Sequence, residues 1–272
     1  MNFNLVGYYG MYLVGTILMF TVSFATYKKY ALKLWQATVF TIVALVGGLT
    51  GTVIMGKIFT ALLRANGIFG KSNMAIYGAV IFTPLILLVA SLITRQPWKK
   101  ILDMIAPSGV IFTACAKLGC MFIGCCAGIE CSFGVYSARH DTTVFPSPVF
   151  EFITMLIIIA VAFRYAFKSD KFVSGTVYPV VGILYGSTRF FWEFLRHYDN
   201  EIERHIIMNM TLWQFCSVIT VIVCTIWLLW LRQDWRVRVR EYVEMRKAEK
   251  AEAERLAKAE KRKNKKRKKK RK

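Results

Sequence analysis

Three charged side chains recur at helical spacing inside an apolar stretch near the end of the chain: Arg189, Glu193 and Arg196. Offsets of four and seven residues place all three on one narrow face of a helix, because each residue turns a helix by about 100°. Charge is expensive at membrane depth and is rarely kept there without a function. The pattern therefore predicts a basic site for an anionic ligand within an apolar environment.

Two lysines and a second glutamate extend this set of charges. Lys117 and Lys57 lie within apolar sequence, although a lysine near a helix end can instead extend its ammonium group to the membrane surface. Glu151 lies near the start of another apolar run. Together with the two arginines, the lysines outnumber the carboxylates, and an excess of cations in a dry site requires an anion to complete it. A lipid phosphate is the expected ligand, because arginine binds phosphate through two parallel hydrogen bonds.

Five of the seven cysteines fall within 17 residues, namely Cys115, Cys120, Cys125, Cys126 and Cys131. The stretch contains no Cys-x-x-Cys pair and no nearby pair of histidines, so it predicts neither a zinc nor an iron–sulfur site, and no cofactor is expected. Two structural interpretations stay open: small buried residues that pack between helices, or a disulfide joining Cys125 or Cys126 to Cys131. A membrane thiol oxidoreductase is the corresponding functional hypothesis.

Long apolar runs must position these residues. The chain has 272 residues and is 56% hydrophobic, which exceeds the average for globular proteins. A helix of about 20 residues spans a bilayer of about 30 Å, and the runs are too uniformly apolar for the alternating strands of a membrane barrel. We expect an all-α, polytopic membrane protein with about seven spans. They lie at about 5–27, 35–56, 75–94, 101–125, 147–167, 175–195 and 211–231.

The distribution of basic residues predicts how these spans are oriented. The loops after the first, third and fifth runs are basic, whereas the others are mixed or sparse in charge. The positive-inside rule then places the N-terminus outside and the C-terminus in the cytoplasm. Residues 1–8 carry no basic side chain, so we expect the first run to be a retained span rather than a signal peptide. The longest non-apolar interruption, at about 128–146, is predicted to be a functional loop on the outer side.

Two regions of different composition follow from this pattern: a transmembrane domain at 1–231 and a basic cytoplasmic tail at 232–272. The tail holds 20 Lys and Arg against 7 Asp and Glu, which accounts for most of the formal charge of +21. It is expected to be helical at first and disordered toward its end. It is interpreted either as a solvated tail that helps to fix topology or as a segment that contacts anionic lipid headgroups. Its few aromatic residues argue against specific recognition of nucleic acid.

Taken together, these segments resemble the prolipoprotein diacylglyceryl transferase family over most of residues 5–198. The most specific match runs from Tyr185 to Arg196 and agrees with Y-G-x-x-R-F-x-x-E-F-x-R at every fixed position. The segment from Lys117 to Gly128 is similar to R-I-G-C-F-x-x-G-C-C-x-G. Residues 145–151 are similar to H-P-[ST]-Q-L-Y-E, and residues 8–15 to the aromatic-Tyr-Gly opening of the family.

The resemblance implies a reaction in the bacterial cell membrane. The family transfers the diacylglyceryl group of phosphatidylglycerol to the lipobox cysteine in the signal peptide of a prolipoprotein, and glycerol phosphate leaves. Cations can stabilise the charge that grows on the leaving phosphate, and the substrate thiol must lose its proton to become the nucleophile.

The resemblance also implies roles for individual residues. Arg189 and Lys117 would hold the phosphate, and Glu193 would orient an arginine, with Tyr77 at a position that the family uses in catalysis. The residues that it implies bind the substrates are Tyr9, Lys57, Gly128, Glu151 and Arg196.

Four positions depart from the family's pattern. Tyr77 replaces a histidine thought to serve in catalysis, and a phenol, with an ordinary pKa of about 10, is a poor base. Lys117 replaces an arginine and so lacks its planar fork. Cys120 replaces the more common asparagine, and Phe145 replaces a histidine. The chain is therefore interpreted as a transferase with a different proton acceptor or, alternatively, as a non-catalytic protein that binds or transports anionic lipid on the same scaffold.

Overall fold

The computed structural model describes residues 3–65, 67, 75–137, 141–168, 174–198 and 207–231. In chain order, its elements are α1 (Phe3–Thr26), η1 (Tyr27–Tyr30), α2 (Leu34–Ala65), α3 (Ile76–Thr94), α4 (Trp98–Ile123), β1 (Glu130–Ser137), β2 (Thr142–Val144), α5 (Ser147–Lys168), α6 (Val177–Trp192), η2 (Glu193–Leu195) and a last helix (Leu212–Leu231). Residues 1–228 form one compact unit. The predicted basic tail, 232–272, lies outside the described residues.

The all-α membrane architecture predicted from the apolar runs is confirmed. Among the described residues, six helices are long and apolar enough to cross a membrane. The predicted span at 175–195 differs from the others, because α6 has only 16 residues and continues into the 3-10 turn η2. The side of the membrane on which each terminus lies stays a prediction.

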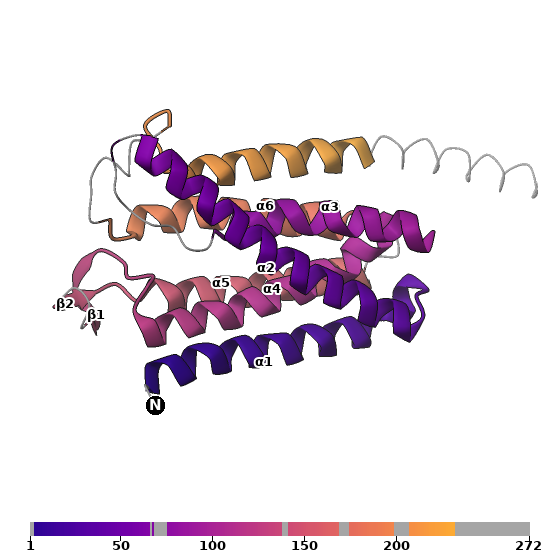
Figure 1. The fold of residues 1–272 in the computed structure, drawn as a ribbon, viewed down its shortest axis with the longest axis horizontal. Helices are drawn as coiled ribbons and strands as arrows, with labels where there is room; N and C mark the ends of the chain where they lie inside the picture. Colours follow the sequence, from indigo (N-terminus) through magenta and orange to yellow (C-terminus); the bar gives the residue numbers. More distant parts are fainter. Residues whose placement is uncertain are drawn as a thin grey trace, which may run out of the picture. The chain divides into compact units, whose positions relative to one another are not determined.

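Figure 1 shows how the helices of this unit pack. α1 lies along α4, α2 packs against α3, and α5 contacts both α4 and α6. At the contact of α2 with α3, a Cβ atom on Gly78 would overlap the carbonyl group of Gly51, so the two backbones touch directly. Small residues at such contacts allow helices to approach closely within a membrane. Large apolar side chains on the outer faces, such as Ile93 on α3, remain exposed, as expected for helices surrounded by lipid.

The start of α6 is fixed by a buried carboxylate on α4. Asp103 Oδ1 accepts hydrogen bonds from the backbone N–H groups of Val177 (3.0 Å) and Tyr178 (3.2 Å), and its Oδ2 accepts one from Gly175 (2.5 Å). The N–H groups of Val177 and Tyr178 are among those that a helix N-terminus leaves without partners in its own backbone. The Asp103 side chain is fully buried and lies inside one of the predicted apolar runs, where the sequence analysis assigned it no role. It holds the first turn of the helix that carries Arg189.

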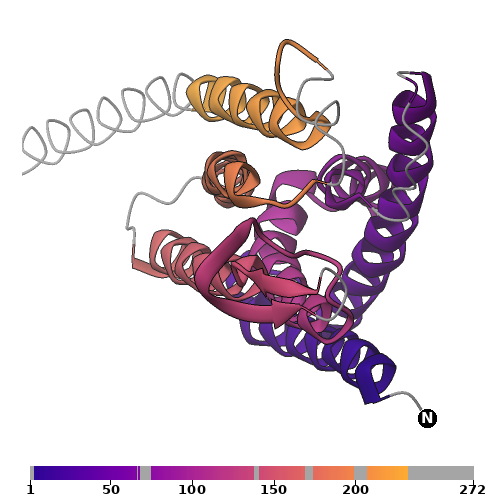
Figure 2. The same ribbon diagram turned by 90° about the vertical axis from the view of Figure 1, so that its left-hand side faces the viewer.

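The predicted loop at 128–146 contains a β-hairpin that the sequence analysis did not anticipate. β1 and β2 pair in antiparallel fashion, with Tyr136 opposite Thr143 and an irregularity between Glu130 and Val135. Figure 2 looks onto the end of the unit where this hairpin lies. The hairpin joins the end of α4 to the start of α5, and these two helices carry two charged residues of the predicted site.

Candidate functional site

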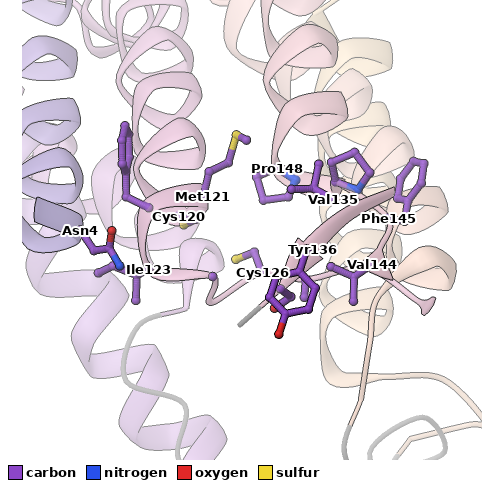
Figure 3. A pocket seen from close by; sticks show the side chains of 15 residues that line it. Asn4, Cys120, Met121, Ile123, Cys126, Val135, Tyr136, Val144, Phe145 and Pro148 are labelled. Atoms are coloured by element: carbon purple, nitrogen blue, oxygen red, sulfur yellow. The ribbon is translucent and has the colours of Figure 1, made fainter. Parts of the chain in front are cut away.

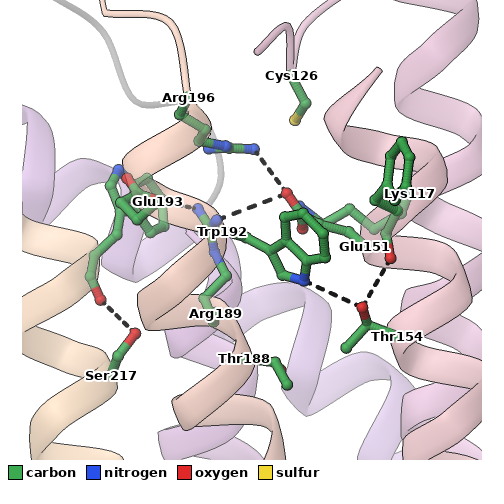
Figure 4. Close-up of polar contacts among 12 residues, drawn as sticks. Lys117, Cys126, Glu151, Thr154, Thr188, Arg189, Trp192, Glu193, Arg196 and Ser217 are labelled. Carbon is green, nitrogen blue, oxygen red and sulfur yellow. Dashed lines mark hydrogen bonds and ion pairs between the residues drawn. The ribbon is translucent and has the colours of Figure 1, made fainter. Parts of the chain in front are cut away.

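Charged side chains from three helices and one short turn converge at a single place. Lys117 comes from α4, Glu151 from α5 and Arg189 from α6, while Glu193 begins η2 and Arg196 follows it. Figure 4 shows the arginines and Lys117 directed toward Glu151. The positions that the sequence analysis selected in separate apolar runs are thus neighbours in space.

Glu151 is the centre of this charge cluster. Its carboxylate forms an ion pair with Lys117 Nζ, and its Oε1 lies 3.6 Å from Arg189 Nη1 and 3.8 Å from Arg196 Nη2. The Glu151 side chain is 1% exposed, so protein rather than water must balance its charge. Since it lies one turn into α5, the N-terminus of that helix also favours its negative charge.

Arg189 and Glu193 form the second ion pair of the cluster. Arg189 Nη2 lies 2.5 Å from Glu193 Oε2, four residues further along the chain, and both side chains are buried. Glu193 also accepts hydrogen bonds from the hydroxyl groups of Tyr198 and, at 3.4 Å, Thr211. The guanidinium group of Arg189 lies 5.9 Å from the centre of the Trp213 ring. Arg189 is therefore positioned by Glu151, Glu193 and the ring of Trp213.

Arg196 reaches the cluster in a different way from that predicted by helical spacing. Helical spacing predicts that Arg196 shares a helix face with Arg189 and Glu193, but α6 ends at Trp192 and Arg196 is extended, with φ −88° and ψ 143°. It forms an isolated β-bridge with Gly128 instead. This bridge, rather than a continuing helix, brings its side chain to Glu151.

Gly128 allows three segments to meet beside the cluster. A Cβ atom at this position would lie 2.6 Å from the Phe145 carbonyl oxygen, 2.6 Å from Ser147 Oγ and 2.8 Å from the Leu195 carbonyl oxygen. Such distances are too short for a side chain of any size. The glycine therefore positions the start of α5 next to the backbone of Arg196.

The cluster carries an excess of one positive charge, because three cations share two carboxylates. Within the described residues, Nε of Arg189 and Nε of Arg196 are buried without a hydrogen-bond acceptor. A buried donor without an acceptor costs about 1–3 kcal/mol. Lys117, Arg189 and Arg196 also line a cavity of about 540 Å³. An anionic ligand in this cavity would balance the surplus positive charge.

Two tyrosines of α1 line the same cavity, but neither is Tyr9, the residue that was expected there. Tyr8 and Tyr12 face it, and the Tyr8 hydroxyl donates to the Tyr12 hydroxyl at 3.1 Å. Tyr9, the residue implied by the resemblance, is 65% exposed and is not among the described residues that line the cavity. The i, i+4 spacing of Tyr8 and Tyr12 was the available signal for this pair.

Two further predicted site residues lie away from the cavity. Lys57 is exposed on α2. Tyr77 is completely buried, and its hydroxyl shares a hydrogen bond with Ser217 Oγ of the last helix. Neither is among the described residues that line the cavity. The structure therefore places Tyr77 in the packed interior, with its ring 6.4 Å from that of Trp213.

All seven cysteines lie in the described part of the chain, and all are free thiols there. The disulfide that the sequence left open, from Cys125 or Cys126 to Cys131, is absent from the described structure. Instead, the sulfur atoms of Cys120, Cys125 and Cys126 lie within 4.8 Å of one another. They line the cavity together with Lys117 and the arginines, so this group of thiols is the candidate for holding a metal ion.

Comparison with known proteins adds an independent line of evidence. The sequence profile of the prolipoprotein diacylglyceryl transferase family matches residues 1–230. The chain is 26% identical over 204 residues to the phosphatidylglycerol–prolipoprotein diacylglyceryl transferase of Clostridium tetani, covering 67% of this chain and 75% of that protein. It is also 26% identical over 174 residues to phosphatidylglycerol–prolipoprotein diacylglyceryl transferase 2 of Clostridium perfringens, covering 61% and 67% respectively.

Proposed function

The chain belongs to the prolipoprotein diacylglyceryl transferase family, and from that premise we propose that it transfers the diacylglyceryl group of phosphatidylglycerol to the cysteine thiol of prolipoproteins. The observation that carries the proposal is the convergence of Lys117, Arg189 and Arg196 on Glu151 at the wall of a cavity among apolar helices. A buried site with surplus positive charge suits a phospholipid phosphate.

The cluster matches the change of charge in this reaction. The phosphate of phosphatidylglycerol carries one negative charge, and the leaving glycerol phosphate gains a second as its bond to the glyceryl carbon breaks. Cations that are already in place stabilise such growing charge without reorganising during the reaction. Glu151 and Glu193 hold the cations in place, because each carboxylate anchors at least one arginine. Arg189 and Lys117 would therefore act on the phosphate, and the two glutamates would position them.

Membership of this family supports a cellular setting for the protein. The protein is a multi-pass membrane protein, and we place it in the plasma membrane of a bacterium, with its N-terminus outside. The acceptor would be the lipobox cysteine of a prolipoprotein signal peptide. The basic tail would contact anionic lipid headgroups on the cytoplasmic side, where each lysine or arginine near the surface contributes about 1 kcal/mol.

A transfer assay with purified protein tests the function. The full chain, in nanodiscs that contain labelled phosphatidylglycerol, is incubated with a synthetic lipobox peptide, and the lipidated peptide is measured by mass spectrometry. Arg189→Ala should lower the rate at least about 100-fold, the loss typical of removing one group that stabilises transition-state charge. Arg164→Ala is the matched control, because Arg164 is an exposed arginine on α5.

Two results would contradict the proposal. Wild-type protein that transfers no lipid and does not restore growth to a transferase-depleted bacterium is not a transferase. Saturable binding of phosphatidylglycerol without turnover would identify a lipid-binding protein on this scaffold instead.

A further inference from the structure

A turn at the end of α4 gathers three thiols. Gly124 ends the helix in the left-handed conformation, at φ 69°, and donates its N–H to the Cys120 carbonyl oxygen at 2.9 Å. The chain then folds back, so that Cys125 Sγ lies 3.9 Å from Cys126 Sγ and both lie near the sulfur atom of Cys120. The spacing of these cysteines in sequence gave no metal signature, because the turn rather than the spacing brings them together.

The separation of the sulfur atoms suits a soft metal ion. With Zn–S bonds of about 2.3 Å, two sulfur ligands of a tetrahedral site lie about 3.8 Å apart, close to the 3.9 Å between Cys125 and Cys126. Among the described residues, no further Cys, His, Asp or Glu joins this group. Three protein ligands with an open fourth position are typical of catalytic zinc sites, whereas structural sites use four.

The thiols lie where both substrates of the reaction must meet. All three line the cavity of the charge cluster, which would hold the phosphate of the lipid. Cys120 and Cys126 also line a second cavity of about 260 Å³, bounded by β1 and by the start of α5 (Figure 3). Cys120 and Cys126 thus line both the basic cavity and the second cavity beside the hairpin. The second cavity offers a route by which the thiol of a peptide reaches them.

The reaction requires that a thiol lose its proton, and the resemblance to the family implies that a histidine thought to serve in catalysis is replaced in this chain. The position where the family has histidine carries Tyr77, whose hydroxyl is buried and engaged by Ser217. A thiol that binds a metal ion gives up its proton on binding. A metal ion beside the phosphate site would therefore replace a general base.

We propose that Cys120, Cys125 and Cys126 bind a zinc ion whose fourth position takes the substrate cysteine as a thiolate. The proposal rests on the transferase function proposed above and supplies its missing step. The substrate thiol releases its proton to solvent as it binds the metal. Its sulfur then attacks the glyceryl carbon that carries the phosphate ester, so that a C–S bond forms while the C–O bond breaks.

The remaining steps balance without an oxidant or a reductant. Glycerol phosphate leaves with the bonding electron pair and is held by Lys117 and Arg189. The thioether product is neutral and binds zinc more weakly than a thiolate does, so it dissociates and opens the fourth position again. The net reaction consumes one thiol and one phosphatidylglycerol, and yields one thioether, one glycerol phosphate and one proton.

Cobalt titration tests the site separately from the transfer reaction. Metal-free full-length protein, reduced and in detergent without phosphatidylglycerol, is titrated with Co²⁺, and absorption from thiolate-to-cobalt charge transfer is recorded. We expect about one cobalt ion per chain, displaced by Zn²⁺.

The Cys120→Ser, Cys125→Ser, Cys126→Ser triple variant should lose this absorption. Cys131→Ser, a control in β1 outside the group, should keep it. A lipobox peptide with cysteine should raise the absorption by about one third, because a fourth thiolate joins three, and a serine peptide should not.

The outcomes separate this proposal from the transferase function. Absence of charge-transfer absorption in the wild type, or no response to the cysteine peptide, overturns the proposal. A triple variant that transfers lipid at the wild-type rate in the presence of a chelator also overturns it while leaving the function intact. If that variant is active but His197→Gln is not, a histidine is the base instead. Peptide-dependent cobalt spectra without any lipid transfer would support the thiol site and contradict the transferase function. Binding of phosphatidylglycerol by the triple variant shows that it is folded.

Discussion

Replacing Glu151 with glutamine removes the carboxylate that Lys117, Arg189 and Arg196 share, while keeping the size and shape of the side chain. The three cations lie within 4 Å of this carboxylate, and the side chain is only 1% exposed. Water therefore has little access to replace the lost charge. The variant isolates the electrostatic role of Glu151 from its packing role.

The expected effect on stability follows from the burial of these pairs. Removing one partner of a buried ion pair costs about 3–5 kcal/mol, and each kcal/mol lowers the Tm of a chain of this size by about 2–4 °C. Glu151→Gln should therefore lower the Tm by about 6–20 °C in a neutral detergent. Phosphatidylglycerol should recover part of this loss, because its phosphate supplies negative charge to the same cations. The lipid should stabilise the variant more than it stabilises the wild type.

Thermal unfolding followed by circular dichroism measures both effects, with phosphatidylcholine as the neutral lipid for comparison. Glu130→Gln is the matched control, because Glu130 is exposed at the start of β1, and its Tm should stay within about 2 °C of the wild type. The reasoning is wrong if Glu151→Gln unfolds at the wild-type temperature. It is equally wrong if phosphatidylglycerol raises the Tm of both proteins by the same amount.

Four further substitutions test other parts of the structure. Arg189→Lys keeps the charge but loses the planar fork, so affinity for labelled phosphatidylglycerol should fall about 10-fold or more. Gly128→Ala should move the backbone of Arg196 and lower the transfer rate at least about 10-fold, while helix content measured by circular dichroism stays unchanged. Asp103→Ala removes the acceptor of backbone N–H groups at the start of α6, those of Gly175, Val177 and Tyr178 among them; unfolding should show a loss of about 1–3 kcal/mol. Gly78→Ala should separate α2 from α3, and limited proteolysis should then cut the chain faster than it cuts the wild type.

Helical spacing made one pair of the charge cluster predictable. Arg189 and Glu193 are four residues apart, and they pair as that spacing requires. Lys117 and Glu151 were identifiable as charges in apolar runs. Their pairing was not predictable, because it depends on how α4 packs against α5. A single sequence predicts which residues share a face of one helix, but it does not predict which helices contact each other.

Departures from regular helix explain most of what the sequence missed. Helical spacing correctly predicted that Arg196 lies near Arg189. However, Arg196 lies beyond the end of α6, and its bridge to Gly128 brings it there instead of a continuing helix. The thiol group depends on the left-handed turn at Gly124, which changes the direction of the chain within a few residues. Tyr8, rather than Tyr9, lines the cavity because the rotation of α1 about its axis is set by packing against α4. In each case a turn of the backbone, or the rotation of a helix about its axis, determines which side chain faces the site.

The shortness of α6 has a consequence for the lipid. Its 16 residues extend about 24 Å at 1.5 Å per residue, less than the roughly 30 Å of the hydrocarbon layer. Because its start is anchored to Asp103 on α4, α6 cannot slide to bring its charged end up to the surface. We expect a phospholipid whose phosphate rests at the interface to move inward, or the bilayer to thin locally, before the phosphate meets Arg189. We therefore expect the transfer rate to depend on acyl-chain length, since lipids that form thinner bilayers hold their phosphate closer to Arg189.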